Sequence, residues 1–144
     1  MADGLFQNGV KNFALGNIAW VFDASPTSGE KNLMKTTLVD TADYTVNLAT
    51  HENRDTGTIS AAAQEEVSAA MTLVSAATDG VCDASDVAFV GTAGDPCEGI
   101  LVYFDSGTPA TDKLLFWWDA SAGLPVTLGG DVTVQWNGSG LAKI

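Results

Sequence analysis

Two short runs of branched and aromatic residues constrain the fold of this chain most strongly. They lie at residues 99–104 and 113–118, each is followed by an aspartate, and a loop rich in Gly, Pro, Ser and Thr separates them. Such runs are typical of paired antiparallel β-strands. A third run, at residues 131–136, alternates apolar and polar residues. The sequence therefore predicts a three-stranded meander at the centre of the fold.

Other segments of the chain have the same β-like character. We expect strands at residues 17–23, 33–40, 66–74, 86–91 and 141–144, joined by turns at 24–31, 91–96 and 137–140. Residues 61–71 also have high helix propensity, so a short helix just before the strand at 66–74 stays open. Seven to nine short strands with at most one short helix predict an all-β fold, either an antiparallel β-sandwich or a jelly-roll-like barrel.

The length of 144 residues suits one domain. We expect residues 1–16 to form an N-terminal arm or flap and residues 17–144 to form a single β domain. The apolar residues of the N-terminal segment are Leu5, Phe6, Val10 and Phe13. Their spacing suits one or two helical turns or an extended arm, and the glycines among them weaken the helical option. The segment either covers the domain's own core as a flap or reaches a neighbouring subunit.

The charge of the chain is strongly one-sided. Asp and Glu number 18 against six Lys and Arg, which gives a net charge of −12. Such a surface repels phosphate backbones and anionic lipids, so we expect no nucleic-acid partner and no membrane partner. No apolar run approaches the roughly 18 residues of a membrane span. The N-terminus has no basic leader followed by an apolar stretch, which predicts synthesis in the cytosol.

The two cysteines and the clustered aspartates do not form a recognisable site. Cys82 and Cys97 match neither a redox pair nor a zinc motif, so we expect buried or half-buried free thiols, with a disulfide formed after cell lysis as the alternative. Residues 78–86 contain spaced aspartates that could suit calcium, yet they match no EF-hand. We expect an ordinary turn there, no metal and no cofactor.

The polar stretch at residues 41–58 contains Tyr44, the only histidine, His51, and the only arginine, Arg54. With acidic residues nearby, His51 could belong to a metal or acid–base site, but no converging partners are visible in the sequence. We interpret the stretch as a solvated loop that contacts a neighbouring molecule or nothing. Because no catalytic motif occurs anywhere in the chain, we predict that the protein is not an enzyme.

Adjacent tryptophans in the second run, Trp117 and Trp118, must point to opposite faces of a strand. Only one of them can enter a given core, and the other must cover a sheet face or an interface. Aromatic residues are enriched at protein interfaces, which indicates a domain that packs against something. A stacking platform for sugars is the competing interpretation.

Several segments resemble small proteins encoded among the head genes of tailed bacteriophages. The resemblance lies in residues 38–52, in residues 94–108, which begin Gly94-Asp95-Pro96, in residues 123–127 and in residues 129–136. It covers the chain from Leu38 to Ile144 in patches and implies a virion component. Residues 54–77 depart from it because they are richer in alanine and acidic residues, so the resemblance does not decide between helix and strand there.

Among virion roles, the residues best suit capsid decoration, in which a small protein binds the outside of the head and stabilises it. The expected partners are the major capsid protein and further copies of the chain, as a dimer or trimer. The protein would lie on the capsid exterior after assembly in the bacterial cytoplasm. A head–tail connector, neck or tail protein and a carbohydrate-binding β module are the alternatives. The candidate interface residues are Leu5, Phe6, Val10, Phe13, Tyr44, His51, Arg54, Trp117 and Trp118.

Overall fold

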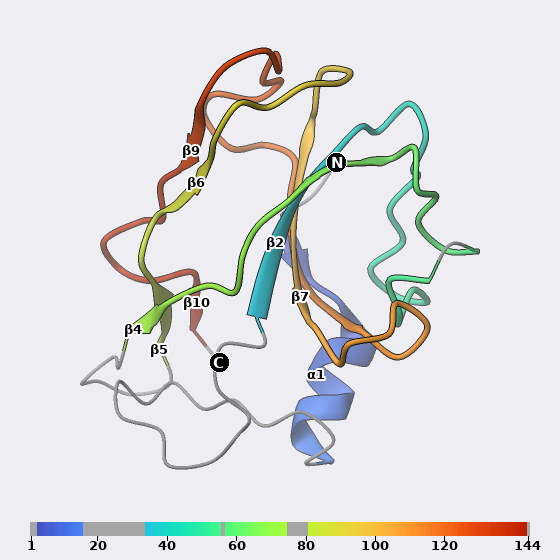
Figure 1. The fold of residues 1–144 in the computed structure, drawn as a ribbon. Coiled ribbons are helices and arrows are strands. Elements are labelled where there is room, and N and C mark those ends of the chain that lie inside the picture. The colour runs from blue at the N-terminus through green and yellow to red at the C-terminus, as the bar shows by residue number, and fades with distance from the viewer. Residues whose placement is uncertain (1–2, 16–33, 56, 75–80, 144) are drawn as a thin grey trace.

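The structure is a computed structural model that describes residues 3–15, 34–55, 57–74 and 81–143 (Figure 1). Its fold is all-β, as the sequence predicts, with antiparallel strand pairs and one short helix among the described residues. The arrangement as a sandwich or jelly-roll barrel stays a prediction. The described elements are β1 (Gly4–Leu5), α1 (Gln7–Ala14), β2 (Met34–Val39), β3 (Gln64–Val67), β4 (Leu73–Val74), β5 (Val81–Ala84), β6 (Val87–Phe89), β7 (Gly99–Phe104), β8 (Lys113–Trp118), β9 (Val132–Val134) and β10 (Ala142–Lys143).

A five-stranded sheet with the order β1-β8-β7-β2-β3 forms the centre of the molecule. The two apolar runs become β7 and β8, and they pair with each other as predicted. The predicted strand at residues 33–40 becomes β2, which pairs with β7 from Met34↔Phe104 to Val39↔Gly99. These three strands are almost completely buried because both faces of the sheet are covered.

Side chains of the central strands alternate between two apolar clusters, one on each face of the sheet. Leu101 and Trp117 belong to the cluster on the first face, whereas Val102 belongs to the cluster on the second face, against which Trp118 packs. The prediction that Trp117 and Trp118 point to opposite faces is therefore confirmed. The first face is covered by Phe6, by α1 and by residues 41–55 and 57–63, which contribute Tyr44 and Ile59.

Two small sheets cover the second face of the central sheet. Their orders are β10-β5-β4 and β6-β9, and in Figure 1 they lie beside β2 and β7. Ala84 of β5, Phe89 of β6 and Val134 of β9 join the second cluster together with Met71. Each small sheet is too short to be stable alone, so packing on the central sheet holds them in place.

The N-terminal segment is built into the domain rather than extended from it. β1 pairs with the edge of β8, and the backbone N–H of Phe6 donates to the carbonyl of Leu115 at 3.0 Å. Phe6 is fully buried. At Gly9, any Cβ would collide with the carbonyl oxygen of Leu114, so the glycine lets α1 lie directly on β8. This arrangement corresponds to the flap alternative and leaves residues 4–14 no freedom to act as an arm.

The third strand of the predicted meander does not pair with the other two strands. Residues 132–134 do form a strand, but β9 pairs with β6 instead of β8. The physical reason is that β1 already occupies the free edge of β8. The predicted final strand exists as β10 and pairs with β5.

Two further local predictions need correction. The strand predicted at residues 66–74 is two strands in the structure, β3, which starts earlier, and β4. The helix considered just before it is a turn in which the Ala63 N–H donates to Ser60. Residues 81–84, expected in an aspartate-rich turn, form β5 because β4 and β10 pair with both of its edges. The predicted strand at 17–23 and turn at 24–31 lie outside the described residues.

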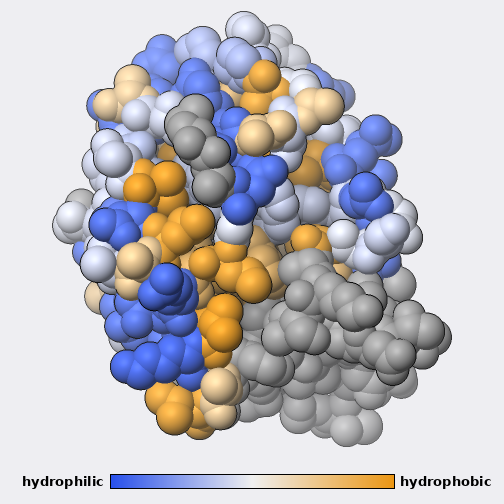
Figure 2. Space-filling view, turned by 180° about the vertical axis from the view of Figure 1, so that it is seen from behind, coloured by the Kyte–Doolittle hydropathy of each residue, from blue (hydrophilic) through white to orange (hydrophobic). Residues whose placement is uncertain are grey.

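The face seen from behind in Figure 2 combines hydrophilic residues with several apolar patches, the largest of which lies near its middle. Large apolar residues exposed among the described ones are Val10 (39%), Leu15 (64%), Val67 (42%) and Val90 (79%). No helix within the described ranges is long and apolar enough to cross a membrane.

Candidate functional site

Arg54, a candidate interface residue, makes several contacts within the chain. Its Nε donates to Asp112 Oδ2 at 3.0 Å, its Nη2 lies 3.0 Å from the same oxygen, and its Nη1 donates to Gln64 at 2.6 Å. The guanidinium also lies 4.4 Å from the centre of the Tyr103 ring. Asp112 is fully buried, and its other oxygen accepts from the backbone and hydroxyl of Ser106. The arginine therefore ties the loop between β7 and β8 to the segment that contains Gln64.

His51 and Tyr44 organise the segment that follows β2. The Tyr44 hydroxyl lies 2.8 Å from His51 Nδ1, and the backbone N–H of Asn47 donates to the same nitrogen at 3.3 Å. A backbone N–H can only donate, so Nδ1 is an acceptor and the ring proton is on Nε2. Burial lowers the pKa of His51, against the smaller opposite effect of Asp55, and burial raises the pKa of Tyr44. Both side chains are thus uncharged at neutral pH, and their hydrogen bonds stabilise the segment that follows β2.

A cavity of about 490 Å³ lies between this segment and the end of β8, and we call it the loop cavity. It is lined by Thr41, Tyr44, Thr45, Val46, Leu48, Trp117 and Asp119. The Trp117 indole donates to Asp119 Oδ2 at 3.0 Å, and the Tyr44 ring meets the Trp117 ring edge-on at 5.6 Å. Aromatic rings and aliphatic side chains form most of the lining, and Asp119 is its one carboxylate.

A second cavity, of about 450 Å³, lies on the other face of the sheet, and we call it the tryptophan cavity. Trp118 and Trp136 line it with their ring centres 5.4 Å apart, together with the polar side chains of Gln135 and Asn137. The Nε1–H of Trp136 is buried and has no hydrogen-bond partner. Two aromatic rings next to amide groups are a chemically suitable lining for a small polar ligand.

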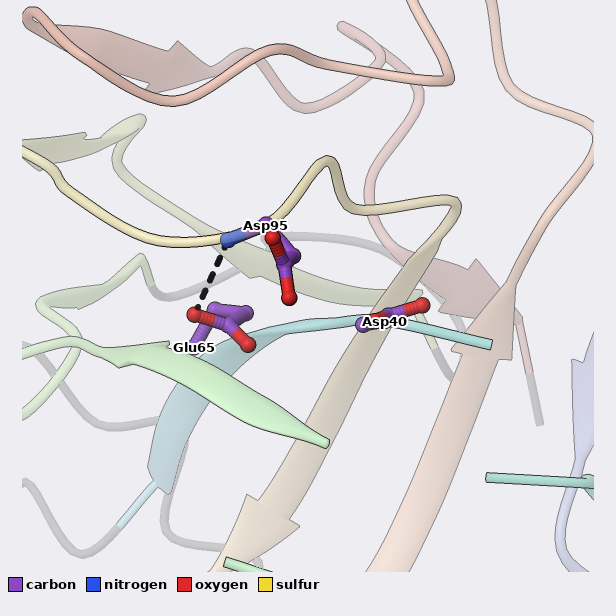
Figure 3. Close-up of side chains that lie close together, drawn as sticks. All are labelled: Asp40, Glu65 and Asp95. Atoms are coloured by element: carbon purple, nitrogen blue, oxygen red, sulfur yellow. Dashed lines mark hydrogen bonds between the residues drawn. The ribbon is translucent and has the colours of Figure 1, made fainter. Parts of the chain in front are cut away.

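Three carboxylates converge near the end of β2 (Figure 3). Oxygens of Asp40, Glu65 and Asp95 lie within 4.8 Å of one another, and Asp95 N–H donates to Glu65 at 3.3 Å. Asp40 also accepts from the backbone N–H of Ala42 at 2.7 Å. Carboxylate oxygens are the ligands that calcium and magnesium prefer, so these residues could hold a divalent cation. No local sequence pattern indicates this cluster, because its members are far apart along the chain.

Both cysteines are free and buried, which confirms the prediction of buried thiols. Burial raises the pKa of Cys82 to about 11. Burial, reinforced by Glu65 and other carboxylates, raises the pKa of Cys97 to about 12. A thiol is nucleophilic only as the thiolate, so neither cysteine is suited to covalent chemistry at neutral pH.

The other candidate interface residues divide between core and surface. Phe6, Tyr44 and Trp117 are buried in the cluster on the first face. Leu5 is half-buried and packs against the second cluster. Val10 stays exposed and Trp118 half-buried, so these two keep accessible surface. The side chain of Phe13 lies outside the described part of the structure.

Comparison with known proteins gives no assignment. The chain matches no family model, and it matches none of the curated proteins either.

Proposed function

We propose that the protein is a structural component of a tailed-bacteriophage virion, and within that class a capsid decoration protein that binds the outer surface of the major capsid protein lattice. The observation that supports the proposal is that the segments resembling phage head proteins, although distant in the sequence, contact one another in the structure. Residue 97 bridges to residue 126, Glu98 accepts from both the backbone and the hydroxyl of Thr41, and the Glu98 N–H donates to Val39. Segments distant in the sequence thus meet in one structural unit.

The fold and the charge suit this role. A decoration protein must stay soluble at high copy number before it binds, and a net charge of −12 opposes self-aggregation. Three of the four described cationic side chains, those of Lys35, Arg54 and Lys113, pair with carboxylates of the same chain. The unpaired acidic groups therefore dominate the outer surface, which keeps the protein away from packaged DNA.

The contact surface that we propose is the exposed side of α1 together with the residue that follows it. Val10 and Leu15 are 39% and 64% exposed. Exposed apolar residues bordered by polar ones are what a protein interface requires. We propose this surface instead of an extended N-terminal arm, because the N-terminal segment is part of the domain. Deleting residues 2–12 would remove β1 and the buried Phe6 and would destabilise the domain itself.

The decisive experiment is a cryo-electron microscopy reconstruction of purified particles that carry the protein. Density repeated over the outer shell, in hundreds of copies, would support decoration. A single ring at one vertex would move the assignment to the neck or tail, and particles without this density would reject a virion role.

Substitutions can then locate the contact. Val10→Asp combined with Leu15→Asp should weaken binding to undecorated heads about tenfold or more, because it places charges in an apolar contact. Val90→Asp is the matched control, since Val90 is 79% exposed on a different part of the molecule. Equal effects of the two variants would show that α1 does not form the contact.

A carbohydrate-binding module is the second candidate, and the tryptophan cavity favours it. Trp118 rather than Trp117 would be the stacking platform, because Trp117 is fully buried. The test is binding to a panel of oligosaccharides. Trp118→Ala should abolish it, and Trp136→Phe, which keeps a ring but removes the unpartnered Nε1–H, should weaken it. The absence of binding to all glycans would eliminate this candidate.

A further inference from the structure

Asp119 lines the loop cavity, and one oxygen of its carboxylate is buried and has no donor. Asp119 is only 9% exposed, its Oδ2 accepts from the Trp117 indole, and its Oδ1 is buried and has no hydrogen-bond partner. The backbone N–H groups of residues 119 and 120 donate to Asp3 Oδ1 instead, at 2.8 and 3.0 Å. A buried carboxylate oxygen without a donor is unfavourable, so a donor supplied from outside would be bound with a gain in free energy.

The charges around this oxygen favour a positively charged donor. Asp3 places a second carboxylate next to the backbone of Asp119, and the whole chain carries a net charge of −12. A donor that carries a positive charge forms a stronger hydrogen bond to a carboxylate than a neutral one. It would also be attracted to this protein over a longer distance.

The remaining lining suits the long side chain that carries such a charge. Val46 and Leu48 offer aliphatic surface to the methylene groups of a lysine or arginine. Tyr44 and Trp117 provide aromatic rings, which attract cations in addition to the carboxylate. A volume of about 490 Å³ is ample for one side chain of this size.

A second copy of the chain is a poor source of this side chain. Of the four cationic side chains that the structure describes, Lys35, Arg54 and Lys113 are held in ion pairs with Asp105, Asp112 and Glu52, which leaves Lys11. A second copy would also bring its own net charge of −12 to a surface of the same sign, which opposes association. We propose that the loop cavity is a docking site for a lysine or arginine side chain of a different protein, with its cationic group bound to the Asp119 carboxylate. The site goes beyond the proposed virion role and does not depend on it.

The test uses small probes, so that its result is independent of any binding to phage heads. The wild-type protein is titrated with Nα-acetyl-arginine amide, Nα-acetyl-lysine amide and the uncharged Nα-acetyl-norleucine amide, and the Trp117 indole and backbone resonances are followed by NMR. The cationic probes should cause saturable shifts at Trp117 and at residues 44–48, with a dissociation constant on the order of millimolar, as expected for a single side chain. Added salt should weaken their binding.

Asp119→Asn should weaken binding of both cationic probes about tenfold or more, because it removes the charge that the site provides. Asp95→Asn is the matched control, a carboxylate outside the cavity, and should leave the affinity unchanged. Circular dichroism verifies that each variant is folded. Equal shifts with the norleucine probe, no saturable shift with the cationic probes, or unchanged affinity in a folded Asp119→Asn variant would each overturn the proposal. The probe comparison on the wild-type protein decides the question even if that variant does not fold.

Discussion

Gly99 is the position where one added methyl group should have the largest effect. This glycine starts β7 and lies against the face of the Trp117 ring. An alanine Cβ there would overlap Cη2 of the ring and lie only 2.5 Å from Cζ2 and 2.9 Å from Cζ3. Ordinary carbon contacts are about 3.5–4.0 Å, so the ring would have to move by roughly 1.5 Å.

The surroundings of Trp117 oppose such a movement. The ring is fully buried, is hydrogen-bonded to Asp119 and packs edge-on against Tyr44. Overpacking of a dense core costs about 1–3 kcal/mol. For a chain of 144 residues the entropy of unfolding is about 300 cal/mol/K, so the melting temperature should fall by about 3 to 10 °C in Gly99→Ala.

Differential scanning calorimetry measures this shift, and two variants make the interpretation specific. Gly130→Ala is the control, because a Cβ at Gly130 meets no atom within 4 Å, and it should leave the melting temperature unchanged or raise it slightly. Combining Gly99→Ala with Trp117→Phe, which removes the outer ring atoms, should destabilise by less than the sum of the single changes. A Gly99→Ala protein that melts together with the Gly130→Ala control would refute the reasoning.

Four other outcomes are expected. Phe6→Ala should lower the free energy of unfolding by about 3–5 kcal/mol in urea titrations, whereas Val10→Ala on the exposed side of the helix that follows Phe6 should change it by less than about 0.5 kcal/mol. Arg54→Met leaves a fully buried carboxylate unpaired and should cost about 3–5 kcal/mol in the same assay, unlike a charge change at the surface. Hydrogen bonds from a lysine and an asparagine lower the pKa of Glu52 below 4.5. The contribution of Glu52 to stability is therefore complete above pH 4.5 and is lost as the pH falls through its folded-state pKa. Glu52→Gln should make the free energy of unfolding less dependent on pH in this acidic range. Because burial raises the pKa of Cys97 to about 12, its alkylation at pH 8 should be far slower in the native protein than in urea, and equal rates would contradict the burial.

The central strands could be predicted because their own residues carry the signal. In β2, β7 and β8, branched and aromatic side chains occupy nearly every position, and such runs favour strands buried on both faces. The opposite directions of Trp117 and Trp118 follow from the two-residue repeat of any strand. For these three strands, the local sequence pattern was sufficient to predict the structure.

The edges of the sheet could not be predicted in the same way. A strand of two residues, such as β1, has no periodicity, and its partner lies near the other end of the chain. Gly9 was taken as evidence against a helix because glycine has low helix propensity. In the structure the same glycine permits the close contact between α1 and β8, so tertiary packing outweighs local propensity.

The sites depend on contacts between residues that are distant in the sequence. Arg54 and Asp112 are 58 positions apart, and no local pattern indicates that they form a buried pair. Tyr44 and Trp117 were recognised as unusual residues, but the cavity between them exists only after the segment beyond β2 folds over β8. Sequence reasoning could select these residues and could not assign them to the core.

The place of β1 in the sheet also determines when the protein can finish folding during synthesis. The hydrogen bond between Asp3 and Asp119 closes a loop of 116 residues, and Phe6 finds its pocket only when β8 is present. The residues of β1 and Phe6 therefore leave the ribosome before their partner and wait, with apolar side chains uncovered, until β8 has been made. Contacts this distant make folding slow and expose intermediates to aggregation and proteolysis. Nascent chains that stop before residue 113 should remain open to proteases, and addition of β8 should protect both ends of the chain together.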